Sequence, residues 1–201
     1  MIRRIYLMRH TAVIKPKEKK FIGQTDLMLN SRGIFQAMRL ADYFSEIPLA
    51  GIYCSSLKRS VDTAEIISRG SKVPLEIIKD FDEINLGSWE GRSFQEIREK
   101  YPLEYLKREM DIYNYRIHGG ESYADLEERS FGAFKALLEN TRGNLLIVGH
   151  QGVNRVIISR LLGTDSEDMK PGLLMEMKYG GITVIEKYEN SFSVSKNILI
   201  A

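Results

Sequence analysis

Two short apolar runs, one near each end of the sequence, are both followed by a histidine. Residues 5–8 (Ile-Tyr-Leu-Met) lead into Arg9 and His10, and residues 144–149 (Asn-Leu-Leu-Ile-Val-Gly) lead into His150. Short apolar runs bounded by loop residues are typical of buried strands in a parallel sheet. Open α/β sheets bind ligands beyond the carboxyl ends of their strands. We therefore expect these two imidazoles, from a chain with three histidines, to meet at one edge of such a sheet.

Strand-like and helix-like segments alternate along most of the sequence. Capping residues mark the expected helix starts, and Gly or Pro marks the ends. The expected helices follow Asn30-Ser31 (ended by Pro48), Ser55-Ser56 (ended by Gly70), Ser93 (interrupted by Pro102), Ser122 (ended before Gly143) and His150 (ended by Gly163). Further expected strands are residues 50–54, 75–78, 173–178, 182–188 and 192–199, with a turn at Glu189-Asn190. This order predicts parallel βαβ units with an antiparallel tail at one edge of the sheet.

The composition sets limits on the class of protein. A chain of 201 residues, 43% apolar and 28% charged, suits one soluble α/β domain over residues 1–201. A net charge of +2 does not indicate nucleic acid or a membrane as the main partner. One cysteine excludes an intramolecular disulfide and fits a reducing compartment. The sequence shows neither a bilayer-spanning run nor a secretory signal, so we expect a cytoplasmic protein.

Polar side chains suited to phosphate chemistry follow the expected strand ends. They are Arg9, His10, Arg59, Glu83 and His150. Arginine binds phosphate oxygens bidentately and stays charged, whereas a neutral imidazole can attack phosphorus and form a phosphohistidine. Positioning and charge neutralisation dominate phosphoryl transfer, so arginines and a second histidine can replace a metal. Glu83 could protonate the leaving alkoxide and then deprotonate water.

The residues after His150 add backbone donors to this set. Gln151-Gly152 begins an expected helix, whose first N–H groups and positive dipole end would face a bound anion. Ser55-Ser56-Leu57 offers the same feature at the second strand-to-helix junction.

Six motifs in order make the sequence resemble the histidine phosphatase superfamily, also called phosphoglycerate-mutase-like. They are Leu7-Met8-Arg9-His10-Thr11, Gly23-Gln24-Thr25-Asp26-Leu27, Ser55-Ser56-Leu57-Lys58-Arg59-Ser60 with Thr63-Ala64, the segment 82–91 around Glu83, Gly119-Gly120-Glu121-Ser122 and Gly149-His150-Gln151-Gly152-Val153. The resemblance spans residues 5 to about 162. It implies a three-layer α/β/α fold with a mostly parallel sheet and an antiparallel edge, and an enzyme without metal or other cofactor.

The resemblance also implies roles for individual residues. His10 would be the phosphorylated nucleophile, Glu83 the proton donor, and Arg9, Arg59 and His150 the phosphate pocket. Residues of the substrate-binding rim would be Thr11, Gln24, Thr25 and Gln151, the last through its backbone amide.

Two departures from the common pattern indicate a branch of the family. Thr11-Ala12-Val13 follow His10 where most members have Gly-Glu-Thr, and Pro16 stands in place of an Asn. This variant is similar to α-ribazole phosphatases of cobalamin assembly. The segment between Glu83 and His150 is shorter than in cofactor-dependent mutases. Both features favour hydrolysis of a small phosphomonoester, with α-ribazole 5′-phosphate as the first candidate.

Other functions remain open at this stage. A phosphoglycerate mutase would keep the phosphate on His10, and a non-catalytic relative would only bind a phospho-ligand. A protein-phosphohistidine phosphatase is a further alternative. Neither the oligomeric state, for which a homodimer is one option, nor the role of the loop 12–29 follows from the sequence. Loops of that length are usually functional or mobile.

For several other polar or aromatic residues, the simpler interpretation is preferred. The lysines of residues 15–20 are first a solvated segment and second an attractor of anions. His118 is expected to be a plain loop residue, Cys54 a small buried hydrophobe and Trp89 a packing residue, although Trp89 and Tyr101 could stack on a substrate. A metal site at the histidines is disfavoured, because the spacing lacks a close ligand pair and two arginines repel a cation.

Overall fold

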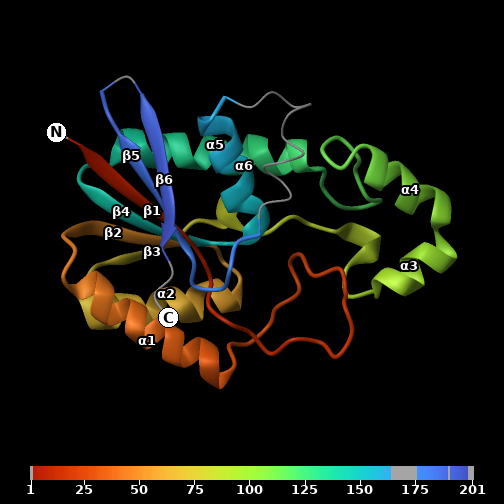
Figure 1. Ribbon diagram of the computed structural model, residues 1–201, viewed down its shortest axis with the longest axis horizontal. Helices are drawn as coiled ribbons and strands as arrows, with labels where there is room; N and C mark the ends of the chain where they lie inside the picture. The colour runs from red at the N-terminus through yellow and green to blue at the C-terminus, as the bar shows by residue number, and fades with distance from the viewer. Residues whose placement is uncertain (1, 164–175, 190, 199–201) are drawn as a thin grey trace.

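The sheet that carries both histidines has six strands in the order β3-β2-β4-β1-β5-β6 (Figure 1). The computed structural model describes residues 2–163, 176–189 and 191–198. The strands are β1 (Arg3–Arg9), β2 (Leu49–Cys54), β3 (Leu75–Ile77), β4 (Asn144–Gly149), β5 (Ile182–Lys187) and β6 (Phe192–Ile198). β1, β4, β2 and β3 run parallel, whereas β5 pairs antiparallel with β1 and β6 antiparallel with β5. The predicted mostly parallel sheet with an antiparallel edge is therefore confirmed.

The register of β1 against β4 places the two histidines side by side. Arg9 pairs with Gly149, so His10 and His150 each follow a residue of the same parallel pair. The His10 N–H donates to the Gly149 carbonyl at 2.9 Å, which continues the pairing by one step. Residues 140 positions apart in the chain thus leave the sheet from adjacent strands at one edge.

Helices cover both faces of the sheet. α1 (Ser31–Ser45) and α2 (Lys58–Ser71) lie on one face, and α5 (Tyr123–Asn140) and α6 (Gln151–Leu161) on the other (Figure 1). Side chains alternate along β1 accordingly: Tyr6 and Met8 pack in one core cluster, whereas Ile5 and Leu7 pack in the other. α3 (Phe94–Lys100) and α4 (Pro102–Met110) lie away from the sheet, beyond its carboxyl edge (Figure 1).

The expected capping residues begin their helices. Asn30 accepts from Gly33 at α1, Ser93 from Glu96 at α3, and Ser122 forms a reciprocal capping box with Asp125 at α5. The prediction that Gly70 ends a helix was wrong, since α2 continues to Ser71 and Lys72 adopts the left-handed conformation at φ 57°. A Cβ on Gly70 would lie 2.6 Å from the Ala41 Cβ, so this glycine instead allows α1 and α2 to approach closely.

The predicted tail strands are only partly seen. The predicted strands 182–188 and 192–199 are present as β5 and β6. Of the predicted strand 173–178, residues 173–175 lie outside the described part of the chain, and residues 176–178 are loop. Of the predicted turn Glu189-Asn190, residue 190 lies outside the described part. Tyr188 donates to the Ser191 carbonyl across it at 2.9 Å.

The loop between β1 and α1 is joined at its ends and attached in its middle. The Ile14 N–H donates to the Met28 carbonyl at 2.9 Å and so joins the two ends of the loop. In the middle of the loop, Phe21 stacks on Phe94 with ring centroids 4.1 Å apart. The second long loop, after β3, contains the short 3-10 turns η1 (Lys79–Phe81) and η2 (Gly87–Trp89). Among the residues that the structure describes, no helix is long and apolar enough to cross a membrane.

Candidate active site

The five side chains expected to carry phosphate chemistry converge at the carboxyl edge of the parallel strands. The rings of His10 and His150 lie 5.3 Å apart between centroids, which confirms that they meet. Arg9 ends β1, Arg59 lies in the first turn of α2, and Glu83 follows η1. All but Arg9 are buried, with at most 9% of each residue exposed.

His10 is arranged as a neutral nucleophile. Its Nδ1 lies 2.9 Å from the Thr11 carbonyl oxygen. Because a carbonyl oxygen can only accept, Nδ1 carries the ring proton and Nε2 keeps its lone pair. Burial, with added repulsion from Arg59 and Arg9, lowers the pKa of His10 well below its usual value of 6.5. The imidazole is therefore neutral at neutral pH, with a free lone pair on Nε2.

His150 has one ring nitrogen bonded and one free. Its Nε2 lies 2.6 Å from the Ser55 hydroxyl, whereas its buried Nδ1 has no hydrogen-bond partner among the described residues. Burial, followed by repulsion from His10 and from the arginines, lowers the pKa of His150 well below 6.5. His150 is thus neutral, with one nitrogen available to a ligand.

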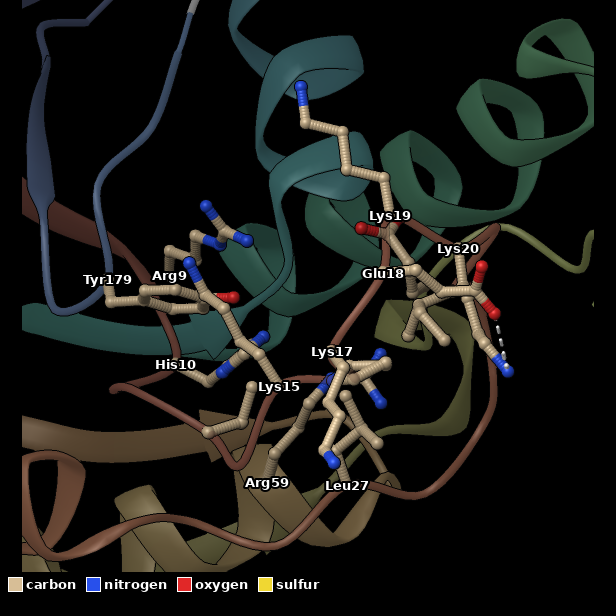
Figure 2. A pocket seen from close by; sticks show the side chains of 14 residues that line it. Arg9, His10, Lys15, Lys17, Glu18, Lys19, Lys20, Leu27, Arg59 and Tyr179 are labelled. Atoms are coloured by element: carbon tan, nitrogen blue, oxygen red, sulfur yellow. Dashed lines mark ion pairs between the residues drawn. The ribbon is translucent and has the colours of Figure 1, made fainter. Parts of the chain in front are cut away.

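Arg9 is held by Gln151, which the sequence indicated as a site residue, and by two groups that the sequence did not indicate. One of its terminal nitrogens donates to Gln151 Oε1 at 2.9 Å and to the Met177 carbonyl at 2.5 Å. Its guanidinium lies 4.1 Å from the centre of the Tyr179 ring, a cation–π contact (Figure 2). Tyr179 belongs to a turn whose Gly180 N–H donates to the Arg9 and His10 carbonyls at 3.1 and 3.2 Å. No motif around Tyr179 marked it as part of the site.

The backbone of the expected motif Gly23-Gln24-Thr25 fixes the side chain of Arg59. Its two terminal nitrogens donate to the Gly23 and Thr25 carbonyls, each at 2.6 Å. Burial lowers the pKa of Arg59 below its usual value, with an opposing contribution from Glu83. Two carbonyl acceptors set the plane of the guanidinium fork, which leaves its other edge toward the cavity described below.

Glu83 is positioned by two backbone donors. Its Oε1 accepts from the Ile84 N–H at 2.9 Å and its Oε2 from the Gly152 N–H at 3.0 Å. The expectation that the first amides of α6 face a bound anion is therefore corrected for Gly152, whose amide binds this carboxylate, and stays a prediction for the Gln151 amide. A Cβ on Gly152 would lie 2.3 Å from Glu83 Oε1, so only glycine allows the contact.

The residues expected at the substrate rim have mostly internal partners. Gln24 donates its side-chain amide to the Glu83 carbonyl at 3.0 Å, and Thr25 bonds Glu90 through both its N–H and its hydroxyl. Thr11 is fully buried, with its hydroxyl 3.0 Å from that of Thr63. The Gln151 side chain contacts Arg9, as above. These four residues shape the groups around the phosphate position.

Glu90 organises the Gly-Gln-Thr segment. Its carboxylate accepts from the Gly23 N–H at 2.8 Å, the Gln24 N–H at 3.3 Å and the Thr25 N–H at 3.0 Å. Successive N–H groups that point at one carboxylate form a backbone anion nest. Glu90 thereby fixes the carbonyls that bind Arg59. The sequence showed Glu90 only as a member of the segment 82–91.

A cavity of about 440 Å³ opens directly onto His10 (Figure 2). Its floor is formed by Arg9, His10, Arg59 and Glu83. Its outer wall comes from the loop between β1 and α1, with Lys15, Lys17, Lys19 and Lys20, and from Tyr179. Lys15 Nζ lies 5.0 Å from the centre of the Tyr179 ring. Lys15, Lys17 and Lys19 are also exposed, so the segment is solvated as expected and borders the cavity as well.

A second cavity, of about 250 Å³, lies on the other side of Glu83. It is bordered by Arg9, Lys20, Arg108 from α4 and Arg155 from α6, with Tyr123 and Gln151. Four cationic side chains and one carboxylate make this space electropositive. Such a space suits a small acidic group.

The remaining residues considered in the sequence lie outside the chemistry. Trp89 is 3% exposed and packs against Phe21, and burial raises the pKa of Cys54 to about 12, so its thiol is inert. The His118 carbonyl accepts from the Ser88 N–H at 2.9 Å. Among the described residues, no three or more His, Cys, Asp or Glu side chains are grouped so that they could hold a metal ion.

Comparison with known proteins relates this arrangement to a family. The model of the histidine phosphatase superfamily (branch 1) matches residues 5–198. The 6-phosphofructo-2-kinase/fructose-2,6-bisphosphatase of Gallus gallus is 34% identical over 169 residues, covering 83% of this chain and 34% of that protein. The chain thus spans about a third of the length of such curated relatives.

Two solved structures resemble the whole described fold. Bacillus stearothermophilus YhfR superposes with a TM-score of 0.85 at 28% identity, covering 96% of this chain and 95% of that one. The α-ribazole phosphatase of Shigella flexneri superposes with a TM-score of 0.84 at 25% identity, covering 96% and 94%.

Proposed function

Because the chain belongs to branch 1 of the histidine phosphatase superfamily, we propose that it is a metal-independent phosphomonoesterase that forms a phosphohistidine on His10. The observation that carries this proposal is the neutral, oriented His10 between two arginines and a second histidine. The resemblance seen in the sequence is confirmed at the level of the family. The reaction and its residue roles are our inference.

The first half of the reaction transfers the phosphoryl group to His10. Nε2 of His10 attacks phosphorus, the P–O bond to the substrate alcohol breaks, and Glu83 gives its proton to the departing oxygen. Arg9, Arg59 and His150 neutralise the phosphoryl oxygens. The products of this step are the free alcohol, the phosphohistidine and the Glu83 carboxylate.

The second half regenerates the enzyme. The Glu83 carboxylate takes a proton from water, the hydroxide formed attacks phosphorus, and the N–P bond to His10 breaks. Inorganic phosphate leaves, and both Glu83 and His10 return to their starting states. No redox step or co-reactant other than water is needed.

For the substrate, we propose a small phosphomonoester with a second acidic group. The support is the cavity beyond Glu83, where Arg108 and Arg155 would bind that group. The similarity to a bifunctional fructose-2,6-bisphosphatase agrees with this class. The alternative is α-ribazole 5′-phosphate, with one phosphate, which is supported by Thr11 and Pro16 and by the likeness to the Shigella flexneri enzyme.

Release of inorganic phosphate over a substrate panel tests both parts of the proposal. The panel contains p-nitrophenyl phosphate, fructose 2,6-bisphosphate, α-ribazole 5′-phosphate and 3-phosphoglycerate. We expect turnover that His10→Ala abolishes. Persistent activity in His10→Ala would refute the nucleophile, and no turnover of any ester by the wild type would favour a binding protein. Retention of phosphate on His10 and dependence on a bisphosphate primer would favour a mutase.

Arg108→Gln separates the two substrate classes. Loss of one charge-assisted bond should raise KM about tenfold for a substrate with two acidic groups and leave KM unchanged for p-nitrophenyl phosphate. Lys107→Gln is the matched control, because Lys107 is an exposed cation on the same helix. Equal KM values in the two variants would remove Arg108 from the substrate site.

A further inference from the structure

The buried hydroxyl of Ser55 has a contact that the reaction above leaves unexplained. Ser55 follows the last residue of β2 and is fully buried. Its Oγ lies 2.6 Å from Nε2 of His150, which is 1% exposed. Either group could donate in this bond, so its direction depends on which tautomer His150 adopts.

The other contacts of the Ser55 hydroxyl bear on whether it donates to His150 or accepts from it. The Leu57 N–H donates to Ser55 Oγ at 3.3 Å, which uses one lone pair of the hydroxyl. Among the described residues, the only acceptor that the hydroxyl proton has is Nε2 of His150. Each direction leaves one buried proton without an acceptor among the described residues: the hydroxyl proton if His150 donates, or the Nδ1 proton if the hydroxyl donates. Only the Nδ1 proton belongs to a ring that lies beside His10, where a phosphoryl oxygen could accept it. The hydroxyl therefore donates, and Nε2 accepts.

The ring proton of the neutral His150 then belongs on Nδ1. This nitrogen is buried, lies beside the ring of His10 and has no partner among the described residues. The Nε of Arg9 is likewise buried without one. A buried N–H without an acceptor is costly, and an oxygen of a phosphoryl group on His10 would be the acceptor that completes it.

We propose that Ser55 is a positioning residue, whose hydroxyl fixes His150 as the Nδ1–H tautomer so that His150 donates to the phosphoryl group. This inference rests on the proposed phosphatase reaction, because the phosphoryl oxygen is the acceptor that favours this tautomer. The opposite tautomer would present a lone pair to the phosphoryl oxygens and would repel them. Ser55 thus determines whether the second histidine stabilises or opposes the transferring group.

Two measurements test the tautomer and its effect. The first is ¹⁵N NMR of the histidine rings in the free wild-type protein, with His150 assigned by comparison with His150→Gln. We expect a protonated Nδ1 and an unprotonated Nε2. A protonated Nε2 in the wild type would overturn the proposal. This measurement needs no activity, so it stays decisive even if the proposed phosphatase function fails.

The second measurement is kcat for p-nitrophenyl phosphate in Ser55 variants. Ser55→Ala should lower kcat about 10- to 100-fold, since one donor to the transition state is then no longer oriented. Ser55→Thr, which keeps the hydroxyl, should restore most of it. Ser60→Ala is the matched control, because the Ser60 hydroxyl is equally buried and donates to the Val148 carbonyl at 2.7 Å without touching His150.

The outcomes separate a positioning role from a structural one. A loss in Ser55→Ala with mixed His150 tautomers and an active Ser60→Ala supports the proposal. Equal kcat in Ser55→Ala and Ser60→Ala overturns it. If Ser55→Ala does not fold, the wild-type tautomer and the activity of Ser55→Thr decide: a protonated Nε2, or an inactive but folded Ser55→Thr, overturns it.

Discussion

Gly152 offers the most direct test of the role proposed for Glu83. Its N–H donates to one oxygen of the Glu83 carboxylate, and a Cβ at this position would lie 2.3 Å from the other. Gly152→Ala therefore pushes the carboxylate away by roughly 1 Å before normal contact distance is restored. The obstructing atom is the end of a flexible side chain, so the carboxylate moves and the backbone does not.

The size of the effect follows from this displacement. A misplacement of about 1 Å can reduce a rate about 100-fold, which is within the contribution of about 10²–10⁴-fold expected from a general acid. An alkyl phosphate, whose alkoxide needs the proton, should lose about 100-fold in kcat/KM. p-Nitrophenyl phosphate, whose leaving group needs little protonation, should lose less than about threefold.

The assay is kcat/KM across a series of phosphate esters with leaving groups of increasing pKa. This constant reports the steps up to release of the alcohol, so the second use of Glu83, as a base, does not enter it. Gly132→Ala is the control, since an added Cβ there meets no atom within 4 Å. Equal losses for all esters, or no loss for any, would refute the assignment of Glu83 as proton donor.

Three further predictions concern Arg9, the histidines and metal. Tyr179→Ala should raise KM for p-nitrophenyl phosphate about two- to tenfold, because it removes the cation–π contact with Arg9. Tyr179→Phe keeps the ring and should leave KM unchanged. Equal KM values for the two variants in steady-state assays would contradict this role of Tyr179. His10 and His150 have lowered pKa values in the folded state, so below about pH 6.5 the unfolded chain binds protons that the folded protein does not. The free energy of unfolding should therefore fall as the pH drops below about 6.5, by at most about 1.4 kcal/mol per pH unit for each histidine. Urea titrations at pH 5 to 8 would show it, and a slope unchanged in His10→Ala would contradict it. Treatment with a chelator should leave phosphatase activity intact, and a loss that added metal reverses would contradict a metal-independent reaction.

The sheet and its edge could be predicted because they depend on local patterns. Apolar runs ending in His10 and His150 gave the strands, and the alternation with helices gave the parallel order, which the register Arg9–Gly149 confirms. The end of α2 was not predicted correctly, since the left-handed residue that follows it, with a φ of 57°, is Lys72 and not a glycine.

The groups that orient the catalytic candidates could not be predicted. Tyr179 reaches Arg9 only because β5 pairs with β1, and Glu90 reaches the Gly23–Thr25 segment only because two long loops fold against each other. The link between Ser55 and His150 depends on β2 and β4 being neighbours. These contacts are long-range, and one sequence carries no local signal for them.

The attachment of the first loop at its ends and in its middle has a consequence for how new specificities could arise. The bond between Ile14 and Met28 joins the two ends of the loop, and the stacking of Phe21 on Phe94 holds its middle. Neither contact involves residues 15–18, which line the cavity. Those four positions can be exchanged as a cassette while Arg59 and its carbonyl partners stay in place. A library randomised there would sample different substrates on one unchanged reaction centre.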